Sequence, residues 1–189
     1  MSAQFDENYQ LILNELRVSL TAIDSPKVVE LLAAITRSRR IFVVGAGRMG
    51  ILLSTFAMRL NHLGFTSHVV GSVTCPPISS EDILLVASSS GETATVREVV
   101  IKAAREKATV AAVTAVPNST IGRLASQNVF LRAPSSLNSS ENETRMSKQP
   151  MKTLFEQTLF VLLECIVLML LDQTGQTAVD MSRRHGNLE

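Results

Sequence analysis

The sequence has no tryptophan, one tyrosine and seven phenylalanines, so its core must be packed mainly with aliphatic side chains. It has only two cysteines, Cys75 and Cys165, and no C-x-x-C spacing, which argues against a disulfide framework or a cysteine zinc site. Neither sign of charge dominates, because 18 Lys and Arg stand against 17 Asp and Glu. Nothing therefore favours a nucleic acid or an anionic membrane as the main partner.

Long apolar runs are also scarce. The first ten residues lack the basic stretch and apolar run of a secretory signal. The most apolar stretch, residues 159–171, contains Glu164 and is shorter than the ~20 residues that span a bilayer. We therefore expect a cytoplasmic protein without a membrane span, in which this stretch is a helix buried in the core or in a subunit interface.

What the sequence does contain is an alternation of short apolar runs and helical stretches. Two amphipathic helices are predicted before residue 40. Five runs rich in Val, Ile and Phe follow, at residues 40–44, 67–71, 82–88, 110–116 and 128–133. Their continuous apolar character indicates strands covered on both faces, and the helices between them require parallel pairing. The pattern predicts an α/β fold of one domain, residues 1–189: a doubly wound, five-stranded parallel sheet with helices on both faces, of the flavodoxin-like kind.

A polar segment and a long helix complete the chain. Residues 133–150 are rich in Ser and Asn and have no period, which fits either a surface loop or a lid ordered by ligand. An apolar helix is predicted from about residue 151 to 173, followed by a tail that ends in "RHGNLE".

Ligands of parallel sheets bind beyond the carboxyl ends of the strands, where two loops stand out. The first, "GAGRMG" at 45–50, matches the dinucleotide fingerprint G-x-G-x-x-G. That site also needs an acid ~20 residues further on, and there is none between Arg59 and Glu81. No nucleotide cofactor is therefore predicted. The glycines serve either close strand-to-helix packing or ligand contact at Gly47, and Arg48 pairs either with a ligand oxygen or in a salt bridge.

The second loop, "ASSSGET" at 87–93, is the better phosphate site. Ser88, Ser89 and Ser90 offer hydroxyl donors, Gly91 permits a close turn, and Thr93 is placed to cap the following helix. The N-terminal N–H groups of that helix favour an anion. A serine-rich turn with one capping residue is the competing interpretation.

Several motifs together resemble a known family. Ser88, Ser90 and Thr93 fit the pattern S-x-S-x-x-T of the sugar isomerase (SIS) domain family. Further similarity lies in "GAGRMG", "FAMRLNHLGF" at 56–65, "QPMKTLFEQTL" at 149–159 and "RHGNLE". The combination is most similar to the 6-phospho-3-hexuloisomerases of that family. The resemblance implies a homotetrameric isomerase of the ribulose monophosphate pathway that converts 3-hexulose 6-phosphate into fructose 6-phosphate through an enediolate, without a metal or another cofactor.

The resemblance also carries over site residues. It implies that Glu156 is the base, and burial beside apolar neighbours would raise the pKa of such a carboxylate towards neutrality. It implies catalytic roles for His62 and for His185, whose tail would reach an active site, most plausibly that of a neighbouring subunit. The alternatives from the residues alone are helix-dipole partners for Glu156 and His62 and a disordered tail for His185. The three histidines have no metal-ligand spacing.

Six positions depart from the family pattern: Met49, Asn61, Ser72, Ala87, Ser89 and Gly186. Of these, Met49, Ser72, Ala87 and Ser89 lie near the expected pocket. These departures leave two other functions open. One is isomerisation of another sugar phosphate, such as a pentose or heptose phosphate. The other is a non-catalytic sensor that binds a sugar phosphate and controls a separate partner chain.

Overall fold

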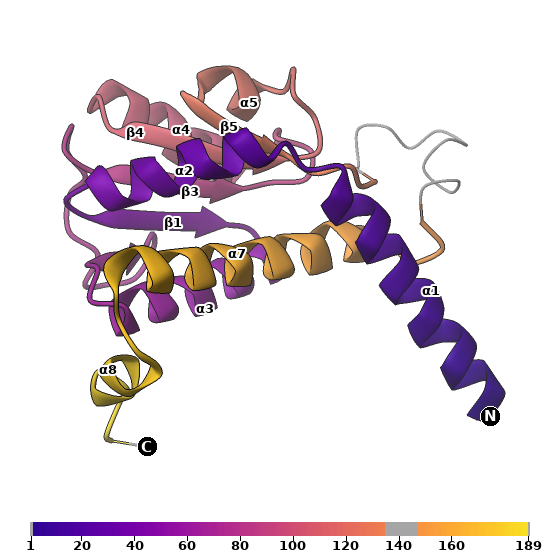
Figure 1. Ribbon diagram of the computed structural model, residues 1–189. Helices are drawn as coiled ribbons and strands as arrows, with labels where there is room; N and C mark the ends of the chain where they lie inside the picture. Colours follow the sequence, from indigo (N-terminus) through magenta and orange to yellow (C-terminus); the bar gives the residue numbers. More distant parts are fainter. Residues whose placement is uncertain (1, 135–146, 189) are drawn as a thin grey trace.

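The five predicted strands form one parallel sheet in the computed structural model, which describes residues 2–134 and 147–188 (Figure 1). The strands are β1 Ile41–Gly45, β2 Ser67–Val69, β3 Ile83–Ala87, β4 Thr109–Thr114 and β5 Gln127–Phe130. They pair in the order β2-β1-β3-β4-β5, which is the flavodoxin-like order. The predicted fold class is therefore confirmed.

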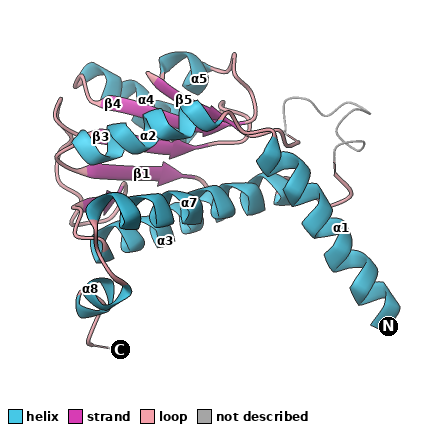
Figure 2. Cartoon of the chain, viewed as in Figure 1, coloured by secondary structure: helices cyan, strands magenta, loops and turns pink. Residues whose placement is uncertain are grey.

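Helices follow or precede the strands as the alternation required (Figure 2). They are α1 Ser2–Thr21, α2 Ser25–Arg37, α3 Arg48–His62, α4 Ala94–Arg105, α5 Thr120–Leu124, α7 Thr153–Thr174 and α8 Ala178–Arg183. Of the polar segment at 133–150, residues 135–146 lie outside the described residues, so the choice between a loop and a lid stays open.

Both faces of the sheet are covered, as the continuous apolar runs predicted. In β3, Ile83, Leu85 and Ala87 belong to the core formed with α2, α3 and α7. Leu84 and Val86 point to the opposite core, formed with α4 and α5. All five side chains are fully buried, which places the chemistry at the ends of the strands and not on their faces.

The long apolar helix α7 is a core helix. Within the described residues it alone is long and apolar enough to cross a membrane by length and composition. Half of its most apolar window is nevertheless buried inside the protein, where it packs against α1, α2 and α3. The expectation of a helix buried in a core or an interface is met in this way.

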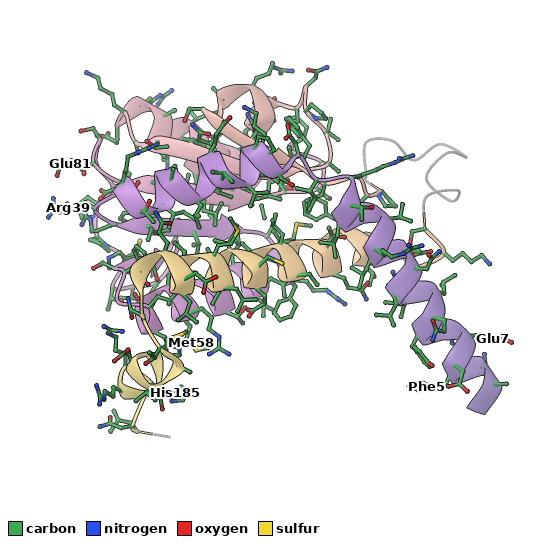
Figure 3. The ribbon with its side chains drawn as sticks, viewed as in Figure 1. Phe5, Glu7, Arg39, Met58, Glu81 and His185 are labelled. Carbon is green, nitrogen blue, oxygen red and sulfur yellow. The ribbon has the colours of Figure 1, made fainter. Side chains whose placement is uncertain are left out.

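Helix α1 projects from the body of the molecule, and its C-terminal part packs against α7 (Figure 1). Its N-terminal half, with Phe5 and Glu7, extends away from the other described helices and strands (Figure 3). Phe5 and Leu13 are 68% and 56% exposed. Apolar side chains on a projecting helix need a covering surface.

Candidate functional site

The sheet register brings the two predicted loops side by side. Gly45, the last residue of β1, is the register partner of Ala87, the last residue of β3. The turn at 46–47 and the serine loop after Ala87 therefore leave the sheet about 4.8 Å apart, the spacing of neighbouring strands. This edge of the sheet is the candidate site.

The three glycines of "GAGRMG" have two different roles. A Cβ on Gly50 would lie 2.6 Å from the carbonyl oxygen of Gly45, so these two glycines permit close packing of α3 on β1. Gly47 has a φ of 58°, and apart from Gly47 and its two chain neighbours no residue comes within 4 Å of where its Cβ would be. Gly47 alone therefore faces open space, and it turns the chain so that Arg48 begins α3.

The serine loop is tied together by its own hydroxyl groups. The Ser88 hydroxyl lies 3.1 Å from the Thr93 hydroxyl and accepts a hydrogen bond from the Gly91 N–H, and the Glu92 N–H donates to Ser90 Oγ. Ser88, Ser89 and Ser90 are buried, and Thr93 is partly exposed. These internal bonds order the loop at the N-terminus of α4.

Two further details fix this loop. Gly91 has a φ of 65°, and a Cβ there would lie 1.9 Å from the Ser119 hydroxyl oxygen, so only glycine fits. Thr93 occupies the N-cap position of α4 but makes no side-chain capping hydrogen bond. The capping bond expected from the sequence is absent, because the Thr93 hydroxyl is directed to Ser88. The first N–H groups of α4 consequently keep their attraction for an anion.

Glu156 and Arg48 meet at this edge. Arg48 Nε lies 2.6 Å from Glu156 Oε2, although the two residues lie in the first turns of different helices. The Glu156 side chain is 13% exposed and that of Arg48 is 67% exposed. Of the two roles predicted for Arg48, the salt bridge is the one observed, and its partner is the predicted base.

Glu92 has a structural role. One of its carboxylate oxygens accepts a 2.6 Å hydrogen bond from the N–H of Thr120 at the start of α5. The other lies 3.7 Å from Arg97. The Thr120 hydrogen bond lowers the pKa of Glu92. The ionised carboxylate therefore links the start of α5 to the serine loop.

His62 and His185 lie together, but away from Glu156. Their ring centroids are 5.2 Å apart, and the tail is held there by Arg184, which donates to the carbonyl oxygen of His62. His62 ends α3 and Arg48 begins it, so the pair lies about 21 Å from Arg48 along the helix axis. Figure 3 shows His185 near Met58 at the end of the molecule opposite the start of α7. Within one chain, the predicted histidines are not part of the Glu156 site.

Metal ligands do not gather in the described residues, where no group of three or more His, Cys, Asp or Glu could hold an ion. The cysteines lie elsewhere: Cys165 is exposed on α7, and Cys75 lines an apolar cavity between β1 and α4 with Pro76. Burial raises the pKa of the Cys75 thiol, which makes it a poor nucleophile.

One polar cluster near the site was not predicted from the sequence. Glu15 of α1 accepts hydrogen bonds from Ser147 Oγ, the Lys148 N–H and Gln149 Nε2 at 2.7, 2.8 and 2.9 Å. The partners are more than 130 residues apart along the chain, so no local pattern could have revealed them. They fix the turn that leads into α7.

Comparison with known proteins gives one consistent result. The model of the SIS domain family matches residues 34–141. A 3-hexulose-6-phosphate isomerase of Bacillus subtilis is 38% identical over 178 residues, which cover 94% of this chain and 95% of that protein. Its namesake from Mycobacterium gastri is 38% identical over 182 residues and covers 96% and 90%.

Solved structures agree on the fold. A Methanococcus jannaschii protein, whose crystal structure led to an inferred function of 3-hexulose-6-phosphate isomerase, superposes with a TM-score of 0.83 at 27% identity, covering 97% of this chain and 99% of that one. The Vibrio vulnificus NanR protein complexed with ManNAc-6P superposes with a TM-score of 0.74 at 17% identity, covering 95% of this chain and 64% of that one. The second likeness bears on the fold alone.

Proposed function

The chain belongs to the SIS domain family, and from this premise we propose that it is a phosphosugar isomerase that interconverts 3-hexulose 6-phosphate and fructose 6-phosphate. The observation that carries the proposal is the position of Glu156, a largely buried carboxylate held by Arg48 at the edge of the sheet where the serine loop ends β3. The relatives that carry this activity in their names match nearly the whole chain, so the proposal concerns all of it.

The reaction moves a carbonyl group from C3 to C2 of the sugar. A base removes the proton from C2, the electron pair forms a C2–C3 double bond, and the former carbonyl oxygen at C3 carries the negative charge of the enediolate. Return of the proton to C3, with transfer of the hydroxyl proton from O2 to O3, leaves the carbonyl group at C2. One carboxylate positioned near both carbons can perform both carbon proton transfers, and we assign this role to Glu156.

The phosphate is assigned to the serine loop. The hydroxyl groups of Ser88 and Thr93 are paired at the start of α4, and that of Ser90 accepts the Glu92 N–H in the same loop; Ser89 lies between the two serines. A phosphate there would receive hydroxyl donors and the N–H groups of the helix N-terminus together. Gly47 leaves open space for the sugar beside this loop.

Arg48 links ligand binding to the base. In its salt bridge the guanidinium holds the carboxylate of Glu156 through Nε, and its remaining N–H groups are on a side chain that is mostly exposed. A guanidinium facing the sugar can stabilise the oxyanion that develops in the enediolate. We assign Arg48 this role, with Glu156 released as base when the sugar oxygens engage the guanidinium.

Assembly into a homo-oligomer, in the form of a tetramer, is part of the proposal. Besides Phe5 and Leu13 on α1, Ile51 on α3 and Leu168 on α7 are 66% and 62% exposed. A second copy of the chain would cover these apolar side chains. It would also give the His62 and His185 pair a role in the site of a neighbouring subunit. We place the enzyme in the cytoplasm, in keeping with its two unpaired cysteines.

An assay of the purified protein with fructose 6-phosphate tests the activity. Formation of 3-hexulose 6-phosphate supports the proposal, and pentose and heptose phosphates tested in parallel identify the substrate if the departures at Met49, Ser72, Ala87 and Ser89 have changed it. Binding of fructose 6-phosphate in calorimetry without turnover of any of these sugars would contradict it and favour the sensor.

A further inference from the structure

The turn that begins α7 is held by a residue of α1 that lies far from it in sequence. Glu15 accepts three hydrogen bonds there, from Ser147, Lys148 and Gln149. Ser147 also accepts the Gln149 N–H at 3.0 Å, so the carboxylate and the turn form one closed network. These bonds hold the pKa of Glu15 below its usual value even though burial acts to raise it. The carboxylate is therefore ionised, and it is fully engaged with this turn.

The same face of α1 holds the other side of the segment. Ser19, four residues after Glu15, donates its hydroxyl to the carbonyl oxygen of Arg132 at 3.0 Å. Residues four apart lie on one face of a helix. One turn of α1 therefore fixes the chain as it leaves the sheet and again before it enters α7.

The turn needs this support because its backbone is strained. Met151 has a φ of 56°, in the left-handed region that side chains other than glycine rarely adopt, because the Cβ crowds the following carbonyl. The Met151 side chain is 91% exposed, so its own packing does not stabilise the conformation. Such residues persist where surrounding contacts determine the backbone. Here these contacts are the Glu15 network on one side and the bonds of Thr153 to the carbonyl oxygen of Pro150 on the other.

The strained turn sets the position of the proposed base. Glu156 lies in the first turn of α7, five residues after Met151, and its N–H donates to the carbonyl oxygen of Lys152. A change at Met151 therefore moves the carboxylate relative to Arg48 and the serine loop. A displacement of about 1 Å at a catalytic group can lower the rate by about a hundredfold.

We propose that Glu15 is a positioning residue for the isomerase reaction: it holds the strained turn at 147–151 and thereby aims Glu156 at the sugar. The inference rests on the proposed function. It gives α1 an effect on the turnover step, exerted through the turn at 147–151, in addition to the apolar surface that the helix exposes.

The test is a double-mutant cycle at Glu15 and Met151. Glu15→Gln keeps the shape but replaces an acceptor oxygen with a donor group, so we expect kcat to fall by about tenfold while KM changes by less than about threefold. Met151→Gly removes the left-handed strain and should restore at least half of the lost kcat in the Glu15→Gln background. A residue that only stabilised the fold would show neither the selective fall in kcat nor this rescue.

Glu7→Gln, on the same helix but in its exposed projecting half, is the matched control and should retain the kcat of the parent protein. Hydrogen exchange of the 147–152 peptide, measured on the parent and Glu15→Gln chains, gives a readout that requires no activity, and it should be faster in the variant. If Glu15→Gln does not fold, Gln149→Ala, which removes one hydrogen bond, takes its place in the cycle.

Unchanged kcat in Glu15→Gln with unchanged exchange overturns the inference and leaves the isomerase proposal intact. A fall in kcat that only follows the loss of folded protein overturns it as well. An inactive parent protein contradicts the proposed function instead, and the exchange measurement then decides whether Glu15 holds the turn.

Discussion

At the scale of single residues, the hydroxyl groups of Ser88 and Ser90 are bonded to Thr93 and to backbone N–H groups of their own loop, so a phosphate would meet an ordered site. Ser90 Oγ accepts the Glu92 N–H, which leaves its own hydrogen free to be donated to an anion. Ser88 and Ser90 thus order the loop to which we assign the phosphate. Removing the Ser90 hydroxyl should therefore weaken phosphate binding more than it slows the chemical step.

Ser90→Ala should raise the KM for the sugar phosphate about tenfold and lower kcat much less, because one hydrogen bond to a charged group contributes about 1.5 to 3 kcal/mol. Steady-state kinetics measure both constants. Ser80→Ala, an exposed serine at the opposite edge of the sheet, is the control and should leave KM unchanged. If Ser90→Ala lowered only kcat and left KM unchanged, the assignment of the phosphate to this loop would be wrong.

Asp82 gives a prediction for stability against pH. Burial raises the pKa of Asp82, but hydrogen bonds from Arg40 and Ser79 outweigh this effect and leave it lowered. The ion pair therefore stabilises the fold above the unfolded pKa of about 3.9 and is lost as the pH falls through the lower folded value. Asp82→Asn, which leaves Arg40 unpaired, should cost about 3 kcal/mol or more at pH 7.

The thermal midpoint measured between pH 7 and pH 3 checks this sign. The difference between the parent and Asp82→Asn should shrink as the pH falls below about 4. Asp172→Asn, at an exposed position on α7, should follow the parent throughout. Parallel curves for the parent and Asp82→Asn over the whole range would show that the pair makes no such contribution.

Some of the residues at the candidate site could be predicted from the sequence and others could not. Ser88, Ser90, Thr93 and Glu156 were predicted because residue type and motif are local signals. For Arg48 the sequence left a ligand and a salt bridge as alternatives, and only the fold brings Glu156 to it. Glu15 could not be predicted, because its partners lie more than 130 residues away in sequence and a single carboxylate in an amphipathic helix has no distinguishing pattern.

At the scale of elements, α3 connects the main features of the molecule. Its first residue, Arg48, forms the salt bridge with Glu156 at the carboxyl edge of the sheet. The carbonyl oxygen of its last residue, His62, accepts a hydrogen bond from Arg184 of the tail. Its packing on β1 depends on Gly50 and Gly45. The position of Arg48 therefore depends on how closely α3 approaches the strand.

Gly50→Ala should destabilise the fold by about 1 to 3 kcal/mol, the range for a methyl group forced into a packed contact. The added Cβ would lie 2.6 Å from the carbonyl oxygen of Gly45, so α3 must move away from β1. Thermal unfolding measures the loss, and Thr55→Ala on the exposed side of the same helix is the control. A thermal midpoint equal to that of the parent would refute the close-packing role of Gly50.

The elements themselves were the most predictable level. The five apolar runs could be recognised as parallel strands because a strand that is buried on both faces does not alternate apolar and polar residues. What the sequence could not supply was the course of the polar segment at 133–150, whose composition has no period. Nor could it supply the direction of α1, of which only the C-terminal part packs against α7.

At the scale of the whole molecule, the distance between the two groups of predicted catalytic residues is the main constraint. Glu156 lies at one end of α3, and His62 and His185 lie at the other. If both groups serve one reaction, two copies of the chain must share each site. The exposed apolar side chains of α1, α3 and α7 supply a surface for such an assembly.

Mixing two inactive variants tests this sharing. Glu156→Gln and His185→Asn should each be inactive alone, because each lacks one partner in every site. After dissociation, mixing and reassembly, about a quarter of the sites should contain both native residues if they come from different subunits of a symmetric oligomer. Recovered activity is the measurement. Complete inactivity of a mixture whose differently tagged chains co-purify as one oligomer would mean that Glu156 and His185 of a site come from the same chain.

The central claim is that Glu156 moves a carbon-bound proton of a sugar phosphate, and deuterium exchange tests it most directly. In deuterated water, the parent protein should replace a carbon-bound hydrogen of fructose 6-phosphate with deuterium, followed by NMR. Glu156→Gln should slow this exchange by about 10²- to 10⁴-fold, the usual contribution of a general base, while its affinity for fructose 6-phosphate stays within about threefold. Exchange by Glu156→Gln at the rate of the parent protein would contradict the account.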